Sequence, residues 1–160
     1  MTRLVVVLPL GALRVGSCFA VADWPLHVTV VAPFLTDAAP AEIMAAIEAA
    51  TRHQPALTVR AGEDALFGRK HDVPVTLIQP DEHLSRLHHT LVAAIRPFAA
   101  TPDGPGFTAP GFSAHVTLKP PARVHPGDTL TLSQITLVDM LPRTHAAGRT
   151  VLAATTLREP

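Results

Sequence analysis

Hydrophobic and polar residues alternate over several short stretches of the chain, and proline or glycine punctuates most of the gaps between them. Such alternation is typical of strands, because successive side chains of a strand point to opposite faces of a sheet. These patterns, together with short continuous apolar runs, predict strands at residues 3–9, 26–35, 57–61, 74–79, 113–119, 129–139 and 149–157.

Two segments have the helical period instead. Apolar residues recur at i, i+3, i+4 and i+7 from Ile43 to Ala50, which predicts an amphipathic helix over about residues 40–52. A second helix begins at Asp81, whose charge favours a helix N-terminus. Its apolar stripe consists of Leu84, Leu87, Leu91, Ile95 and Phe98. Residues 101–111 are rich in proline and glycine and predict a loop.

Composition narrows the class of protein. The chain has 160 residues, of which 48% are hydrophobic and 16% charged, with 13 basic and 13 acidic side chains. These values predict one compact domain over residues 1–160 and argue against a protein that coats nucleic acid through bulk charge. Recognition of a single phosphate stays open. The one cysteine, Cys18, leaves no intramolecular disulfide and no CxxC metal or redox motif.

The N-terminus allows two interpretations. Arg3 followed by the apolar residues 4–10 resembles a short signal peptide, and residues 20–22 resemble its cleavage site. Arg14 places a charge inside the segment that would have to stay apolar, and residues 5–8 also have the character of a buried strand. We expect a cytoplasmic protein that keeps its first 22 residues, with secretion as the alternative. No apolar run reaches the length of a membrane-spanning helix.

The tripeptide His-x-Thr occurs three times, at His27–Thr29, His88–Thr90 and His115–Thr117. The first and third copies lie in predicted strands, where residues i and i+2 share a face. Each of these strands therefore presents an imidazole and a hydroxyl side by side. The second copy lies in a predicted helix, where residues two apart point in different directions, so we assign it to the surface or flank of that helix.

The first and third copies also match in their surroundings. Both read His-Val-Thr, both continue with an aliphatic residue, and both have a proline six residues past the histidine. Polar residues on the open face of two amphipathic strands are one explanation. The repeated match favours another, in which the strands bring two imidazoles to a shared cleft. Because the ordinary pKa of histidine is near 6.5, one imidazole can act as a base while the other acts as an acid.

These two motifs, together with residues 3–9 and 112–118, resemble the two-histidine (2H) phosphoesterase superfamily. Within it, the resemblance is strongest to the 2′-5′ RNA ligase-like, RNA 2′,3′-cyclic phosphodiesterase branch. The resemblance implies an α+β fold of two pseudo-symmetric lobes that enclose a central groove. In each lobe a helix packs on an antiparallel sheet. It also implies one His-x-Thr motif from each lobe and catalysis without a metal.

Carried to this chain residue by residue, the resemblance implies that His27 and His115 are the catalytic pair. Thr29 and Thr117 become ligands of the phosphate oxygens.

The chain departs from the family pattern at one position. Members of this branch often have an arginine two residues beyond the aliphatic residue of the second motif, and Pro120 stands there in this chain. Lys119 shares strand parity with His115 and Thr117, so it is a candidate for the positive charge on the substrate phosphate. An exposed lysine at a strand end is the equally weighted alternative.

The activity we expect is hydrolysis of 2′,3′-cyclic phosphates, in RNA or in nucleotides, to 2′-phosphates. The substrate is an RNA end or a small nucleotide, and we expect a monomer that needs no cofactor and no metal. No H-E-x-x-H motif or i, i+4 histidine pair is present to bind zinc. The alternatives are a 2′-5′ RNA ligase, a phosphodiesterase of 2′-5′ oligonucleotides or cyclic nucleotides, and a nucleotide-binding module without turnover.

Two further features bear on substrate binding. Trp24, Phe34, Phe67 and Phe112 are candidates for stacking on a nucleobase, although a place in the core is the commoner role of each. The pair Arg69-Lys70, which follows Phe67, is the densest basic spot of the chain. Two solvated surface charges are the ordinary interpretation of that pair, and contact with an RNA backbone is the functional one.

Overall fold

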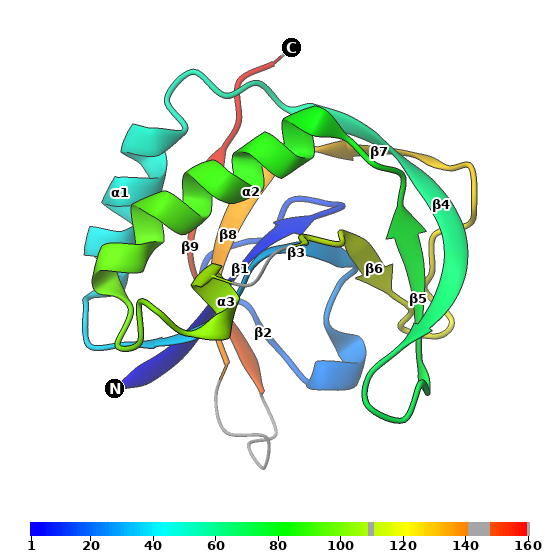
Figure 1. Ribbon diagram of the computed structural model, residues 1–160, viewed down its shortest axis with the longest axis horizontal. Coiled ribbons are helices and arrows are strands. Elements are labelled where there is room, and N and C mark those ends of the chain that lie inside the picture. The colour runs from blue at the N-terminus through cyan, green and yellow to red at the C-terminus, as the bar shows by residue number, and fades with distance from the viewer. Residues whose placement is uncertain (109–110, 141–147, 160) are drawn as a thin grey trace.

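The computed structural model describes residues 1–108, 111–140 and 148–159 (Figure 1). The strands are β1 (Thr2–Pro9), β2 (Cys18–Phe19), β3 (His27–Thr36), β4 (Leu57–Phe67), β5 (Val73–Ile78), β6 (His115–Thr117), β7 (Thr129–Leu132), β8 (Gln134–Asp139) and β9 (Arg149–Thr156). The helices are α1 (Pro40–Ala50), α2 (Glu82–Ile95) and α3 (Pro105–Thr108), with 3-10 turns η1 (Val21–Asp23) and η2 (Arg96–Phe98).

The strands form one curled antiparallel sheet in the order β2-β9-β8-β1-β3-β6-β5-β4-β7 (Figure 1). β1 lies inside the sheet between β3 and β8, and its residues Leu4–Pro9 are buried. The prediction of a buried strand at residues 3–9 is therefore confirmed, and the run that resembles a signal peptide provides a central strand of the fold.

β3 and β6 join the two halves of the sheet. Among the residues that the structure describes, these strands share one ladder pair, Val28 with Val116, and both valines are fully buried. Each valine is the middle residue of a His-x-Thr motif. Because side chains alternate along a strand, the flanking histidine and threonine of each motif lie on the face opposite the two valines.

Helices α1 and α2 pack against one another and cover one face of the sheet (Figure 1). The predicted stripe of α2 is buried at Leu84, Leu87, Leu91 and Ile95, in the same core as Val28. The side chain of Asp81 caps the helix by accepting a hydrogen bond from the Leu84 N–H at 2.9 Å. Both predicted helices are confirmed, with Arg96–Phe98 as a 3-10 extension of the second one.

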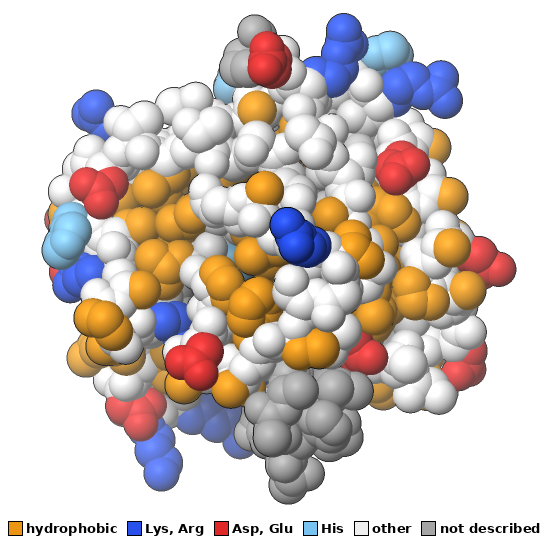
Figure 2. All heavy atoms as spheres, turned by 180° about the vertical axis from the view of Figure 1, so that it is seen from behind, with side chains coloured by type: hydrophobic (Ala, Val, Ile, Leu, Met, Phe, Trp, Pro, Cys, Tyr) orange, Lys and Arg blue, Asp and Glu red, His pale blue; other side chains and the backbone are white. Residues whose placement is uncertain are grey.

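The other face of the sheet is less covered. A small second cluster there consists of Val5, Val7, Val138 and Trp24. Figure 2 shows this face from behind the helices. Hydrophobic side chains gather over its middle, and a Lys or Arg side chain lies at the centre of the face.

The structure corrects several predicted boundaries. The predicted strand at 129–139 is two strands, β7 and β8, because the chain leaves one half of the sheet at Ser133 and enters the other. The strand predicted at 57–61 continues to Phe67, in a hairpin with β5 whose residues beyond Ala61 in β4 are no longer buried. The predicted loop at 101–111 contains the short helix α3, which Pro105 begins, and residues 109–110 of that loop lie outside the described residues.

The fold class is that of a curled antiparallel sheet with few helices. This agrees with the expected antiparallel sheet and packed helices, whereas the division into two pseudo-symmetric lobes around a groove stays a prediction. No helix in the described part of the chain is both long and apolar enough to cross a bilayer.

Candidate active site

The two strand-borne motifs meet where β3 pairs with β6. The antiparallel pair Val28 with Val116 sets the register, so His27 lies beside Thr117, and Thr29 lies beside His115. Directly opposed residues of antiparallel strands have Cβ atoms about 5 Å apart. A single ladder pair thus brings together four polar residues from motifs that lie 88 positions apart in the sequence.

Both histidine rings are oriented in the same way. Nδ1 of His27 lies 2.8 Å from the carbonyl oxygen of Pro25, and Nδ1 of His115 lies 3.0 Å from that of Ser113. A carbonyl oxygen only accepts hydrogen bonds, so each Nδ1 carries the proton. In the neutral ring, Nε2 is then free to accept a proton, and in the charged ring it can donate one.

Each of these histidines also contacts an aromatic ring. Trp24 is buried and stacks on His27, with ring centroids 3.9 Å apart at an angle of 30°. Phe67 meets His115 edge to face, with centroids 4.6 Å apart. Two of the four candidate stacking residues therefore lie in the first layer around the histidine pair.

The two other candidate aromatic residues lie elsewhere. Phe112 is half-buried and stacks on His88, with centroids 4.1 Å apart. Phe34 is buried in the core and contacts Phe107, so its ring is not available to a nucleobase.

Burial and positive charge distinguish His27 from an ordinary histidine. Burial lowers the pKa of His27 to about 4, against the opposing effect of the Pro25 carbonyl, and the charges of Lys119, His115 and Arg149 add to the decrease. An imidazole with this pKa is neutral at physiological pH, which is the state that a general base requires.

Lys119 lies within electrostatic reach of this histidine. Its ammonium group is half-buried, and burial together with the charge of Arg149 lowers its pKa. Lys119 is thus not fully exposed, and its role as a phosphate ligand stays a prediction.

Sequence reasoning missed Arg149. This residue begins β9, is buried, and places its guanidinium 5.2 Å from the centroid of the Trp24 ring that stacks on His27. No local pattern marks it, since it stands alone in a predicted strand far from both motifs. Only the fold, which carries β9 to the histidine-bearing face, shows its relation to the site.

A pocket of about 230 Å³ opens where β3 and β6 diverge beyond their single pair. Thr29 and His115 line it, and so do Phe112 and His88.

The third motif copy lies in α2, as predicted, but the assignment of His88 to the surface or flank of the helix needs correction. His88 is half-buried, its Nδ1 lies 2.7 Å from the carbonyl oxygen of Val30, and it forms part of the pocket wall. Its neighbour His89 is exposed.

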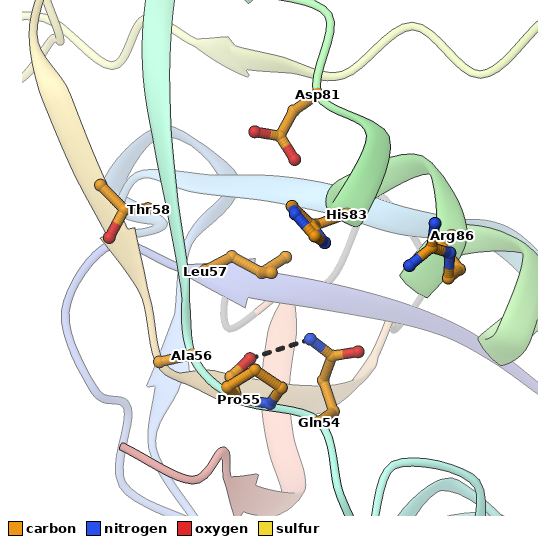
Figure 3. Close-up of a pocket in the computed structure, with 8 residues that line it drawn as sticks. All are labelled: Gln54, Pro55, Ala56, Leu57, Thr58, Asp81, His83 and Arg86. Atoms are coloured by element: carbon orange, nitrogen blue, oxygen red, sulfur yellow. Dashed lines mark hydrogen bonds between the residues drawn. The ribbon is translucent and has the colours of Figure 1, made fainter. Parts of the chain in front are cut away.

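A larger cavity of about 300 Å³ lies elsewhere, between the start of α2 and the chain segment before β4 (Figure 3). Asp81, His83 and Arg86 face it from α2 and its cap, and Gln54 donates a hydrogen bond to the Pro55 carbonyl at 2.9 Å on the other side. No residue of the two strand-borne motifs lines it. Cavity size alone therefore does not identify the site.

Within residues 1–108, 111–140 and 148–159, no three His, Cys, Asp or Glu side chains gather in a geometry that could hold a metal ion. The groups that converge at the histidine pair are cations and hydroxyls, a set that favours an anionic ligand.

Comparison with known proteins agrees with this geometry. The family model described as the 2′-5′ RNA ligase superfamily matches residues 7–135, a range that contains both strand-borne motifs. No curated protein matches the chain.

Similar solved structures cover nearly the whole chain. E. coli LigT complexed with NADP+ is 18% identical, with a TM-score of 0.60 over 99% of both chains. TT0787 of Thermus thermophilus is 21% identical, with a TM-score of 0.65 over 98% of both chains. A protein described as a phosphoesterase is 19% identical, with a TM-score of 0.59 over 99% of this chain and 100% of its own. At these identities the likeness shows a shared fold.

The lowered pKa of His27 gives a testable result. We expect the Cε1–H resonance of His27, assigned by its loss in His27→Gln, to titrate with a midpoint of about 4. Since the unfolded chain binds this proton near pH 6.5 and the folded chain does not, the free energy of unfolding contributed by His27 decreases as the pH falls from about 6.5 to about 4. A midpoint at or above 6.5 would show that His27 is neither desolvated nor surrounded by cations.

Proposed function

Because the chain belongs to the 2′-5′ RNA ligase superfamily, we propose that it is a metal-independent phosphodiesterase that opens 2′,3′-cyclic phosphates of RNA ends or nucleotides. The observation that carries this proposal is the pair of imidazoles on adjacent strands, each held through Nδ1 by a backbone carbonyl. Family membership supports phosphoester chemistry, and the paired histidines support acid and base catalysis at one phosphorus atom.

Hydrolysis needs a base for the attacking water, an acid for the leaving ribose oxygen and donors for the phosphoryl oxygens. We assign the base to His27, whose lowered pKa keeps Nε2 unprotonated. As water attacks phosphorus, its proton passes to His27, the new P–O bond forms and the bond to O3′ breaks. His115, protonated on Nε2, gives its proton to O3′. Each proton transfer contributes roughly 10²- to 10⁴-fold to the rate.

In-line attack places the water and the leaving oxygen on opposite sides of phosphorus. Two imidazoles on neighbouring strands suit that geometry. The pairing of β3 with β6 also places a threonine hydroxyl beside each imidazole. Thr29 and Thr117 then donate hydrogen bonds to the two non-bridging oxygens.

Lys119 and Arg149 supply the positive charge that this chain lacks at Pro120. Like charges held close together destabilise one another, and a bound phosphate anion relieves that repulsion. The structures of E. coli LigT complexed with phosphate and with 3′-AMP support such binding in this fold.

The family description favours a second candidate, joining of RNA ends through a 2′-5′ linkage. By microscopic reversibility the same pair serves with exchanged roles, so that one histidine deprotonates a ribose hydroxyl and the other protonates the departing oxygen. A nucleotide-binding module without turnover is the least supported alternative, because both imidazoles are present and oriented for proton transfer.

Removal of either histidine tests the proposed pair. We expect His27→Ala and His115→Ala each to lower kcat at least about 10²-fold, and the double variant to cost much less than the product of the two losses, because the pair acts as a unit. Turnover of a 2′,3′-cyclic nucleotide by variants with unchanged melting temperature is the measurement.

The matched control is His89→Ala, which removes an exposed imidazole of α2 and should leave kcat unchanged. The proposed pair is wrong if the control loses as much activity as His27→Ala, or if either strand variant keeps its turnover.

The identity of the leaving oxygen can be read from the product. The resemblance to the cyclic phosphodiesterase branch implies that O3′ faces the acidic histidine, so a 2′,3′-cyclic phosphate should yield a 2′-phosphate. Phosphorus NMR of the reaction mixture distinguishes the two monoesters. A predominantly 3′-phosphate product would mean that the substrate lies in the opposite orientation, with O2′ toward the acid.

A further inference from the structure

The hairpin of β4 and β5 ends in a turn that presents two adjacent cations. The strands pair as far as Phe67 with Val73, and the His71 N–H closes the turn by donating to the Gly68 carbonyl at 3.1 Å. Arg69 and Lys70 occupy the two central positions of this turn, and both are exposed. The turn lies at the other end of the molecule from α1 (Figure 1).

This hairpin begins at the wall of the candidate site. Phe67, the last residue of β4, contacts the ring of His115. Lys70 follows three residues later, so its backbone lies within about 10 Å of that of Phe67. The turn therefore lies within reach of the nucleotides that precede a terminal phosphate held at His115.

The side chains around the turn suit single-stranded RNA. Val73, which pairs with Phe67, is 39% exposed and shares its face of the hairpin with the half-exposed ring of Phe67. Leu66, which is 58% exposed, adds apolar surface on the opposite face. Proteins that bind single strands combine such stacking and apolar surfaces with cations that follow the backbone.

The two cations of the turn are also available to a ligand. The ion pairs within the described residues are Met1 with Asp37, Arg96 with Asp103 and Arg123 with Asp64, so neither Arg69 nor Lys70 takes part in one. Asp72, the acidic residue of the turn, directs its carboxylate toward Gly68.

We propose that residues 66–73 form a second contact surface for RNA, which holds the nucleotides that precede the cyclic phosphate. The substrate is then the end of an RNA strand rather than a free mononucleotide. This inference rests on the proposed function and adds the class of substrate to it. Because the net formal charge of the chain is zero, the contact is local, and it neutralises about two phosphates.

Charge reversal at the turn tests the proposal. The value of kcat/KM is measured for a 2′,3′-cyclic mononucleotide and for an RNA decamer with the same terminal group. We expect the unaltered protein to prefer the decamer at low salt. Arg69→Glu combined with Lys70→Glu should lower kcat/KM for the decamer at least about tenfold, and leave the value for the mononucleotide within about twofold.

The matched control reverses two exposed arginines on the helical side, Arg52→Glu with Arg86→Glu, and changes the net charge by the same amount. It should leave both substrates unaffected. The proposal is wrong if the unaltered protein uses the two substrates equally well. It is also wrong if the turn variant loses as much kcat/KM for the mononucleotide as for the decamer, or if the control variant loses as much as the turn variant.

A binding measurement separates this inference from the proposed function. Fluorescence anisotropy with a labelled decamer that ends in a 3′-phosphate needs no turnover. Weaker binding by the turn variant, with a shallower salt dependence than the unaltered protein, supports the contact surface even if neither cyclic phosphate is hydrolysed. Unchanged binding overturns it even if hydrolysis proceeds as proposed.

Discussion

The pairing of Val28 with Val116 is the contact on which the candidate site depends. Within the described residues it is the single ladder pair that joins β3 to β6, and both side chains are fully buried. Its antiparallel sense sets each histidine beside the threonine of the other motif. Burial of the two valines therefore fixes which face the four polar residues occupy, and the rest of the core holds these two strands together.

The two motifs are alike in sequence but differ in environment. His27 lies against a buried tryptophan ring and within electrostatic reach of Lys119 and Arg149, whereas His115 meets the edge of the half-exposed Phe67. Pairs of titratable groups whose surroundings differ can divide acid and base roles between them. The fold thus lowers the pKa of His27 through surroundings that the matching tripeptides do not reveal.

Much of this arrangement could be predicted from the sequence. The spacing of apolar residues, and the face of a strand on which a residue lies, depend only on neighbouring positions in the chain. The apolar stripes predicted both helices, and strand parity placed His27 with Thr29 on one face and separated both from the copy in α2. The break at Ser133 was missed although the chain marks it: the adjacent polar residues Ser133 and Gln134 shift the phase of the alternation between Leu132 and Ile135. That shift does not show that the chain changes halves of the sheet there.

The missed residues depend on contacts between distant segments. Arg149 reaches the site only because β9 lies in the same sheet as β3, and His88 joins the pocket wall only because α2 packs on β3. Arg149 has no local signal, and the His-x-Thr copy at His88 marks the residue without revealing its place in the pocket wall.

The central claim is that two histidines act as acid and base on one phosphorus atom without a metal. The most direct measurement is the pH dependence of kcat/KM for a 2′,3′-cyclic nucleotide, recorded in the presence of EDTA. We expect full activity and a bell-shaped profile whose limbs belong to the histidine pair, with the acidic limb near pH 4. Activity that EDTA abolishes and one divalent metal restores, or a profile with no limb from either histidine, would contradict it.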